Sequence, residues 1–263
     1  MKTPPDFFAG IRLTGRLLVA PALMAVTALP FCLAEDDVTA LTAFGALIAL
    51  CLVLGGLAQL VPQKEDVGAA DAIAAVALAW LLIGGLCGIP FAVVAGAAPA
   101  GSELARAYGP PVNALFEGMS GITSCGLTLA ARPDLLPASL QWWRSLCEWV
   151  GGVGVVVSML LLLDPAEHHD AFYRAEARTW RLDAPVRRTA VRIWSIFLVL
   201  SAVSVLVLKL AGESWWGAVN HGMTGIATGG FSIRPDSFQS ASVAVQGTAM
   251  AIMVLGALSF RTY

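Results

Sequence analysis

Residues 118–134 read GMSGITSCGLTLAARPD, and residues 222–236 repeat this text as GMTGIATGGFSIRPD. The first eleven residues of the two copies align without a gap, and Arg-Pro-Asp follows in both after a difference of two residues. Close internal repeats are typical of duplicated membrane folds, in which the functional site often lies where the repeats meet. We therefore interpret the repeated segment as one structural device used twice.

The rest of the chain is unusually apolar. Hydrophobic residues make up 57% of it and charged residues 13%, and the mean hydropathy is +0.76, which indicates an integral membrane protein. A helix needs roughly 20 apolar residues to cross the hydrocarbon core of a bilayer. Five charge-free runs reach or approach this length: 17–34, 38–63, 72–102, 193–208 and 237–260. A sixth run, 149–163, is shorter and is extended outward by residues 140–143 and Leu146.

These runs predict an all-α membrane protein with six transmembrane helices and two re-entrant pore loops. Each repeat contains a long helix, a short amphipathic piece with its loop, and a second helix that returns across the membrane. We expect an N-terminal transmembrane hairpin at 1–68, a first pore repeat at 69–164, a cytoplasmic linker at 165–186 and a second pore repeat at 187–263.

The basic residues predict the orientation of the chain. With the N-terminus placed inside, eleven of the sixteen Lys and Arg residues fall on the inner side of the six runs. This positive-inside bias predicts a multi-pass protein of the cell inner membrane with a cytoplasmic N-terminus and both repeated loops on the outer side. A net charge of -2 and the lack of a basic patch in the sequence argue against a nucleic-acid partner.

The repeated loop has the character of a pore loop. Backbone that is neither helix nor barrel strand survives in a membrane only where it is buried in protein or lines water. In such loops, main-chain carbonyls replace the hydration shell of a cation. Glycine permits positive φ, so Gly126 and Gly230 could turn consecutive carbonyls toward one axis. The expected cation ligands are the carbonyls of Thr123, Ser124, Cys125, Gly126, Leu127, Ala227, Thr228, Gly229, Gly230 and Phe231.

Side chains around this loop leave several alternatives open. Hydroxyls could bind an ion, its waters or the neighbouring backbone; they belong to Thr123, Ser124, Thr128, Thr228 and Ser232. The loop glycines could instead serve helix packing, which is the expected role of the glycines in residues 151–154. No acidic ligand occurs inside the loop, which argues against a divalent site. The spans also carry no zinc or nucleophile pattern, so we expect neither an enzyme nor a bound cofactor.

Four charged or titratable residues lie close to the two loops in the sequence. Arg144 and Glu148 are four residues apart on a predicted helix, and we expect them to form an ion pair at the outer interface. The alternative is a role in shaping the outer vestibule. Glu117 and His221 occupy equivalent positions in the two short helices, where they could brace these helices or be solvent-exposed. Four tryptophans are expected in the interfacial aromatic belt: Trp142, Trp143, Trp215 and Trp216.

Further stretches accompany the two loops, and the whole resembles a known family. They lie at residues 71–91, 143–154 and 173–176, with WRSL running on to WVGGVG in the second of them. Together they resemble the Trk/Ktr/HKT superfamily of potassium transporters, closest to the N-terminal half of the bacterial Trk membrane subunit. The resemblance implies a pore of helix-loop-helix units with one filter glycine each, transport of potassium, a homodimer, and a cytosolic nucleotide-binding regulatory subunit.

One departure from that family is large, because its members carry four pore units in one chain and this chain holds two. Half a ring of carbonyls cannot surround an ion, so we do not expect this chain to conduct alone. The favoured expectation is a fragment whose remaining two repeats come from the same gene. A second chain could also supply them. The alternative function is that of a non-conducting structural or regulatory membrane subunit.

Overall fold

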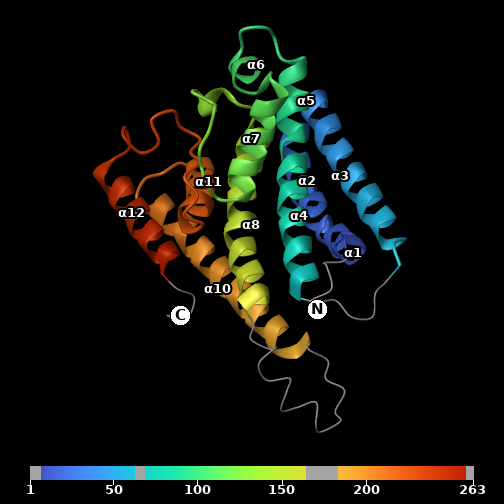
Figure 1. Ribbon diagram of the computed structural model, residues 1–263. Coiled ribbons are helices and arrows are strands. Elements are labelled where there is room, and N and C mark those ends of the chain that lie inside the picture. The colour runs from blue at the N-terminus through green and yellow to red at the C-terminus, as the bar shows by residue number, and fades with distance from the viewer. Residues whose placement is uncertain (1–6, 63–68, 164–182, 259–263) are drawn as a thin grey trace.

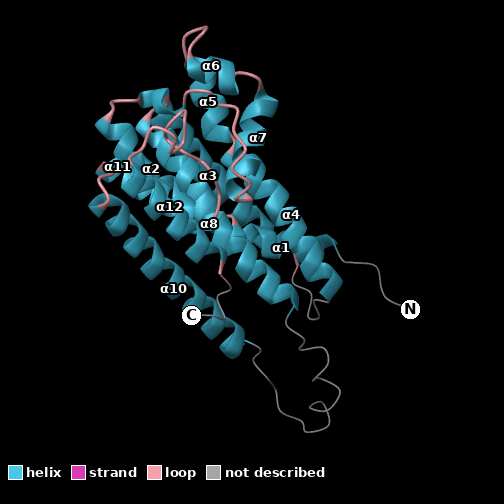
Figure 2. Cartoon of the chain, turned by 90° about the vertical axis from the view of Figure 1, so that its left-hand side faces the viewer, coloured by secondary structure: helices cyan, strands magenta, loops and turns pink. Residues whose placement is uncertain are grey.

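The computed structural model describes residues 7–62, 69–163 and 183–258, and every regular element in these ranges is a helix (Figures 1 and 2). The all-helical class expected from the sequence is therefore confirmed for this part of the chain. Most of the expected cytoplasmic linker, at 165–186, lies outside the described residues.

Three helices form the N-terminal part: α1 (Phe7–Leu17), α2 (Val19–Ala34) and α3 (Val38–Gln59). α2 and α3 pack against each other as a hairpin. Asp36 forms the turn with a φ of 51°, and the Asp37 carboxylate caps α3 by accepting a hydrogen bond from the Ala40 amide at 2.9 Å. The hairpin packs on both flanking helices of the first repeat, with α2 against α8 and α3 against α5.

The first repeat contains five α-helices and a short 3-10 turn. Their bounds are α4 (Ala69–Cys87), α5 (Ile89–Ala97), α6 (Glu103–Tyr108), α7 (Pro111–Ile122), η1 (Pro133–Leu135) and α8 (Ala138–Leu163). Pro111 occupies the first turn of α7, where its missing N–H has no partner to lose. α7 packs closely on α4 at a point where both helices carry glycine. There is no room for a side chain there, since a Cβ on Gly118 would lie 2.6 Å from the Gly84 carbonyl oxygen.

The second repeat has fewer elements: α10 (Asp183–Leu210), α11 (Trp215–Ile226) and α12 (Val243–Ala257). Serines cap both of the later helices, since Ser214 accepts from the Gly217 amide at 3.0 Å and Ser242 from the Val245 amide at 3.3 Å. α10 and α11 each pack on α8, which lies between the first-repeat helices and α12 in Figure 1. The two repeats therefore meet along α8.

Four helical segments in the described ranges are long and apolar enough to cross a membrane: Thr14–Ala34, Val38–Gln59, Val76–Ala97 and Val191–Leu210. They match four of the six helices expected from the sequence. Of the other two, α8 has 26 residues but carries Arg144 and Glu148, and α12 is an apolar helix of 15 residues.

The expected tryptophan belt is wrong for Trp143. Its side chain is fully buried, and its Nε1 donates a hydrogen bond to the Cys87 carbonyl at 2.9 Å. α8 turns this residue toward α4 and the hairpin, a direction that a count of sequence positions does not reveal. Trp215, in contrast, is 62% exposed.

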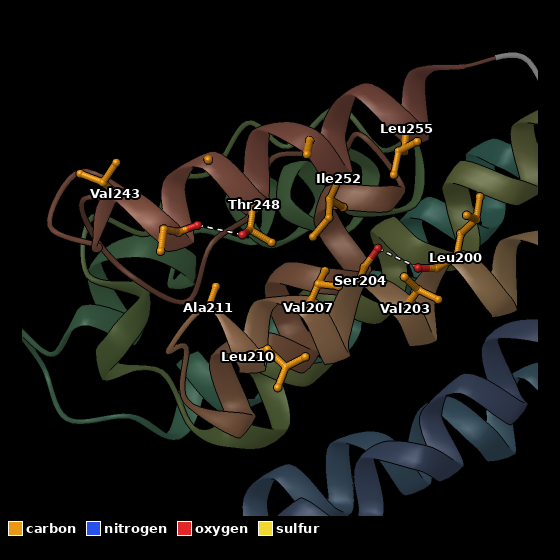
Figure 3. Close-up of a pocket in the computed structure, with 13 residues that line it drawn as sticks. Leu200, Val203, Ser204, Val207, Leu210, Ala211, Val243, Thr248, Ile252 and Leu255 are labelled. Carbon is orange, nitrogen blue, oxygen red and sulfur yellow. Dashed lines mark hydrogen bonds between the residues drawn. The ribbon is translucent and has the colours of Figure 1, made fainter.

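A cavity of about 730 Å³ lies between α10 and α12 (Figure 3). Two hydroxyls face it, and both are bonded within their own helices (Figure 3). Ser204 Oγ donates to the Leu200 carbonyl at 2.7 Å, and Thr248 Oγ1 donates to the Ala244 carbonyl at 2.8 Å. The other lining side chains are apolar, so this groove offers no free side-chain ligand to an ion.

Candidate ion-binding site at the paired loops

The loops that follow α7 and α11 contact each other through their glycines. Gly126 has a φ of +74° and Gly230 a φ of +123°, values that favour glycine in both loops, as the sequence predicts. A Cβ on Gly126 would overlap the Gly229 carbonyl oxygen and would lie 3.0 Å from the Gly230 Cα. The backbone therefore brings the two repeated segments together at equivalent residues.

Backbone amides of the first loop turn back toward the short helix that precedes it. The Ser124 amide donates to the Gly121 carbonyl and the Cys125 amide to the Ser120 carbonyl, each at 2.9 Å. The second loop repeats the arrangement: the Thr228 amide donates to Gly225 at 3.1 Å and the Gly229 amide to Thr224 at 3.0 Å.

The carbonyl groups of the ten expected ligands, unlike these amides, mostly have no hydrogen-bond partner in the described part of the protein. Leu127 is an exception among the expected ligands, because its carbonyl accepts a hydrogen bond from Ser120 Oγ at 2.6 Å. Within the described ranges, no hydrogen bond ends on the carbonyl oxygens of the other nine. Those nine are Thr123, Ser124, Cys125, Gly126, Ala227, Thr228, Gly229, Gly230 and Phe231. In the same ranges, most loop amides are therefore bonded to protein groups while nine carbonyls are not, which is the combination that suits a cation-binding backbone.

The hydroxyls of the first loop bind protein groups. Thr123 Oγ1 donates to the Met119 carbonyl at 2.6 Å, and Ser124 Oγ donates to the Glu148 carbonyl at 2.8 Å. Thr128 Oγ1 donates to a Glu117 carboxylate oxygen at 2.8 Å. Of the roles left open by the sequence, these three side chains take that of bonding to neighbouring protein groups.

Glu117 braces the first loop from inside the protein. Its side chain is fully buried and accepts hydrogen bonds from the Tyr108 hydroxyl at 2.9 Å and the Leu129 amide at 3.2 Å, in addition to that from Thr128. At the equivalent position of the second repeat, His221 is also buried, and its Nε2 lies 2.9 Å from Ser232 Oγ. Solvent exposure is therefore excluded for both, and each residue ties its short helix to a neighbouring segment, as expected.

Arg144 pairs with Glu117 and not with Glu148, so the expected ion pair is wrong. The Arg144 Nε lies 2.8 Å from a Glu117 oxygen, and the arginine side chain is buried rather than interfacial. α7 packs alongside α8 and places a carboxylate beside the guanidinium. Spacing within one helix carries no information about such a partner.

The repeated Arg-Pro-Asp segment is held differently in the two copies. Arg132 and Asp134 form a two-fold ion pair, with distances of 2.9 and 2.6 Å, and this hydrogen bonding lowers the pKa of Asp134. Arg234 instead pairs with Glu213, a buried residue just before α11 that no sequence pattern singles out. The shared motif therefore has unlike partners: its first copy pairs within itself, and its second copy is held by Glu213.

Comparison with known proteins now identifies the family. The family model for TrkH, described as a cation transport protein, matches residues 42–262 of this chain. The chain belongs to the TrkH family. It is thus a member of the Trk/Ktr superfamily, as the repeated loops suggested, and the family is one of transporters.

Individual relatives agree with this assignment. An uncharacterized cation transporter of Methanocaldococcus jannaschii is 36% identical over 188 residues, covering 71% of this chain and 37% of that protein. The Trk system potassium uptake protein TrkI of Halomonas elongata is 30% identical over 254 residues, covering 94% of this chain and 49% of that protein. The TrkH protein of the same organism is 28% identical over 228 residues, covering 82% and 45%.

A solved structure shows the same fold. The crystal structure of the potassium transporter TrkH from Vibrio parahaemolyticus superposes with a TM-score of 0.74 at 24% identity, covering 97% of this chain and 51% of that one. This chain therefore spans about half the length, or less, of the proteins it matches.

Proposed function

We propose that this chain takes part in potassium uptake across the cell inner membrane and supplies two of the four pore units of a carbonyl-lined filter. The observation that carries the proposal is the meeting of two loops in which, within the described residues, the amides of Ser124, Cys125, Thr228 and Gly229 are bonded and nine carbonyls are not. These nine carbonyls, with that of Leu127 at the outer edge, would replace the water around a dehydrated potassium ion. The relatives named for potassium uptake or cation transport support this choice of cargo.

The remaining parts of the proposal concern partners and orientation. Two further pore repeats, from the same gene or from a second chain, would complete the ring around the ion. We propose a homodimer, a cytosolic nucleotide-binding regulatory subunit and a cytoplasmic N-terminus. The segment boundaries at residues 68, 164 and 186 belong to the same proposal, with the N-terminal hairpin as a scaffold outside the pore.

Potassium uptake in a bacterial strain without its own uptake systems tests the proposal. The chain is expressed together with two further pore repeats, and rubidium or potassium entry is measured for Gly126→Ser and Gly230→Ser. Gly101→Ser and Gly212→Ser are matched controls, because both glycines have positive φ and a Cβ on either would contact nothing within 4 Å.

We expect the two loop variants to lose uptake or potassium selectivity while the two controls retain both. Uptake that ignores the loop glycines, or that suffers equally in the controls, would contradict the filter. A complete lack of uptake with normal insertion and assembly would favour the non-conducting subunit.

A further inference from the structure

Glu148 lies against the second loop although it belongs to the first repeat. Its side chain is fully buried, and its two carboxylate oxygens lie 3.0 and 3.1 Å from the Phe231 amide, which donates to them. A Cβ on Gly229 would overlap this carboxylate. The contact therefore explains why the second loop has glycine at this position, where the first loop has Cys125.

Arg144 lies one turn earlier on α8 and also reaches the second loop. Its Nη1 donates to the Ser232 carbonyl at 2.9 Å, and its guanidinium carbon lies 4.2 Å from the centre of the Phe231 ring. The other nitrogens hold the first repeat, with Nε on Glu117 at 2.8 Å and Nη2 on Thr128 Oγ1 at 3.1 Å. One guanidinium thus connects both loops.

Because the peptide unit is planar, these contacts determine where the neighbouring carbonyl groups point. The Phe231 N–H and the Gly230 carbonyl belong to one planar trans peptide unit, so they point in opposite directions. A carboxylate that holds the N–H therefore turns the Gly230 oxygen away from α8. Arg144 acts two residues further along the chain. It donates a hydrogen bond to the Ser232 carbonyl, so that this oxygen is not free to bind an ion.

The second repeat has no equivalent pair. Gly151 in α8 and Gly256 in α12 make the same contact with the last residue of a short helix, since a Cβ would lie 2.7 Å from the Ile122 carbonyl carbon and 3.0 Å from that of Ile226. These glycines align the two helices. Arg144 and Glu148 then correspond to Ala249 and Met253, which carry no charge.

We propose that Arg144 and Glu148 are positioning residues that set the carbonyl directions of the second loop and thereby the potassium selectivity of the pore. This inference rests on the filter proposed above and adds to it a specific source of selectivity, located in the first repeat. Neither side chain is an ion ligand in this account, because both act through the backbone of residues 230–232.

The test compares residue swaps that the chain itself suggests. Glu148→Met and Arg144→Met introduce apolar side chains, and Glu148→Gln retains an acceptor oxygen for the Phe231 amide. Trp143→Phe is the matched control, because Trp143 is a fully buried residue of the same helix whose hydrogen bond goes to the Cys87 carbonyl and not to either loop. Potassium and sodium uptake are both measured, normalised to folded protein, in the assay that includes Gly126→Ser and Gly230→Ser.

We expect Glu148→Met and Arg144→Met to lower the potassium-to-sodium uptake ratio about tenfold, the scale of one lost hydrogen bond to a charged group. Glu148→Gln should stay close to wild type, and Trp143→Phe should lower the amount of folded protein without changing the ratio. An unchanged ratio in the methionine variants, or an equal loss in Glu148→Gln, would overturn the inference. If the wild-type pore ignores its filter glycines, the proposed function itself fails, which is a distinguishable result.

A second experiment guards against variants that fail to fold. Gly229→Cys places a side chain against the Glu148 carboxylate and should prevent folding, whereas Gly229→Cys combined with Glu148→Ala provides space and should restore it. We expect the rescued protein to take up cations with a lowered potassium-to-sodium ratio. A rescued protein with the wild-type ratio would overturn the positioning role. So would failure of every Arg144 and Glu148 variant, including Glu148→Gln, to fold while Trp143→Phe folds.

Discussion

Ser124 and Thr228 occupy equivalent places in the two loops and share the same left-handed backbone conformation, with φ values of 52° and 51°. Residues with a side chain rarely adopt this conformation, and β-branched residues such as threonine do so least readily. Each residue lies two positions before the glycine of its loop. The matching strain indicates that the surrounding contacts, and not local preference, determine the path of both loops.

Replacing Thr228 with glycine should relieve this strain. We expect Thr228→Gly to raise the free energy of unfolding by about 1 kcal/mol and to lower potassium selectivity, because the loop would gain alternative conformations. Thermal unfolding in detergent and the potassium-to-sodium uptake ratio measure the two effects. Asp36→Gly, at a φ of 51° in the N-terminal hairpin, should change stability alone. Selectivity that follows stability in both variants would contradict this interpretation.

Glu117 should be among the most sensitive positions in the fold. Glu117→Ala leaves the buried Arg144 guanidinium without its carboxylate, and we expect a loss of about 3–5 kcal/mol in the free energy of unfolding. Tyr108→Phe removes one of the hydrogen bonds to the same carboxylate and should cost about 1 kcal/mol. Both effects are measured by unfolding in detergent. Equal losses in the two variants would show that the ion pair adds nothing to the free energy of unfolding.

Two glycines of α12 should respond oppositely to alanine. Gly256→Ala introduces a methyl group against the Ile226 backbone and should cost about 1–3 kcal/mol. Gly247 has no atom within 4 Å of its would-be Cβ, so Gly247→Ala should be neutral or stabilise the helix by up to about 1 kcal/mol. The melting temperatures of the two variants in the same detergent provide the comparison, and a fall of equal size in both would contradict the packing.

Acid should weaken the packing of α6 through Glu103. Burial alone would raise the pKa of this carboxyl, but hydrogen bonds from the Arg132 amide and the Arg106 guanidinium outweigh it and lower the pKa from its ordinary value of 4.5. A lowered pKa contributes stability above pH 4.5 that is lost as the pH falls through the folded-state value. Wild type should therefore lose stability in this acid range, and Glu103→Gln should lose less. If the stabilities of wild type and Glu103→Gln fall in parallel with pH, Glu103 is not the cause of the acid destabilisation.

Features that repeat along the chain could be predicted from the sequence. The apolar runs located the long helices, and the doubled motif located both short helices and the two glycines with positive φ. These features depend on local backbone preference and on the length needed to cross a bilayer, so one sequence is enough to read them. Family membership followed from the same motif.

Partners across elements could not be predicted in this way. The sequence paired Arg144 with Glu148 because both lie on one helix, whereas α7 supplies Glu117 and the second loop supplies the Phe231 amide. Gly229 was considered only as a filter residue, although its missing side chain makes room for Glu148. Such relationships depend on how helices from different repeats cross, which no periodicity within one segment encodes.

The central claim concerns the carbonyls of two loops, and anomalous scattering from bound thallium tests it most directly. Thallium substitutes for potassium in carbonyl-lined sites and can be located in crystals of the completed transporter. We predict an anomalous peak in coordination contact with the carbonyl oxygens of Gly126 and Gly230. A peak at the Glu117 or Glu148 carboxylates, or loop carbonyls hydrogen-bonded within protein with no thallium beside them, would contradict the account.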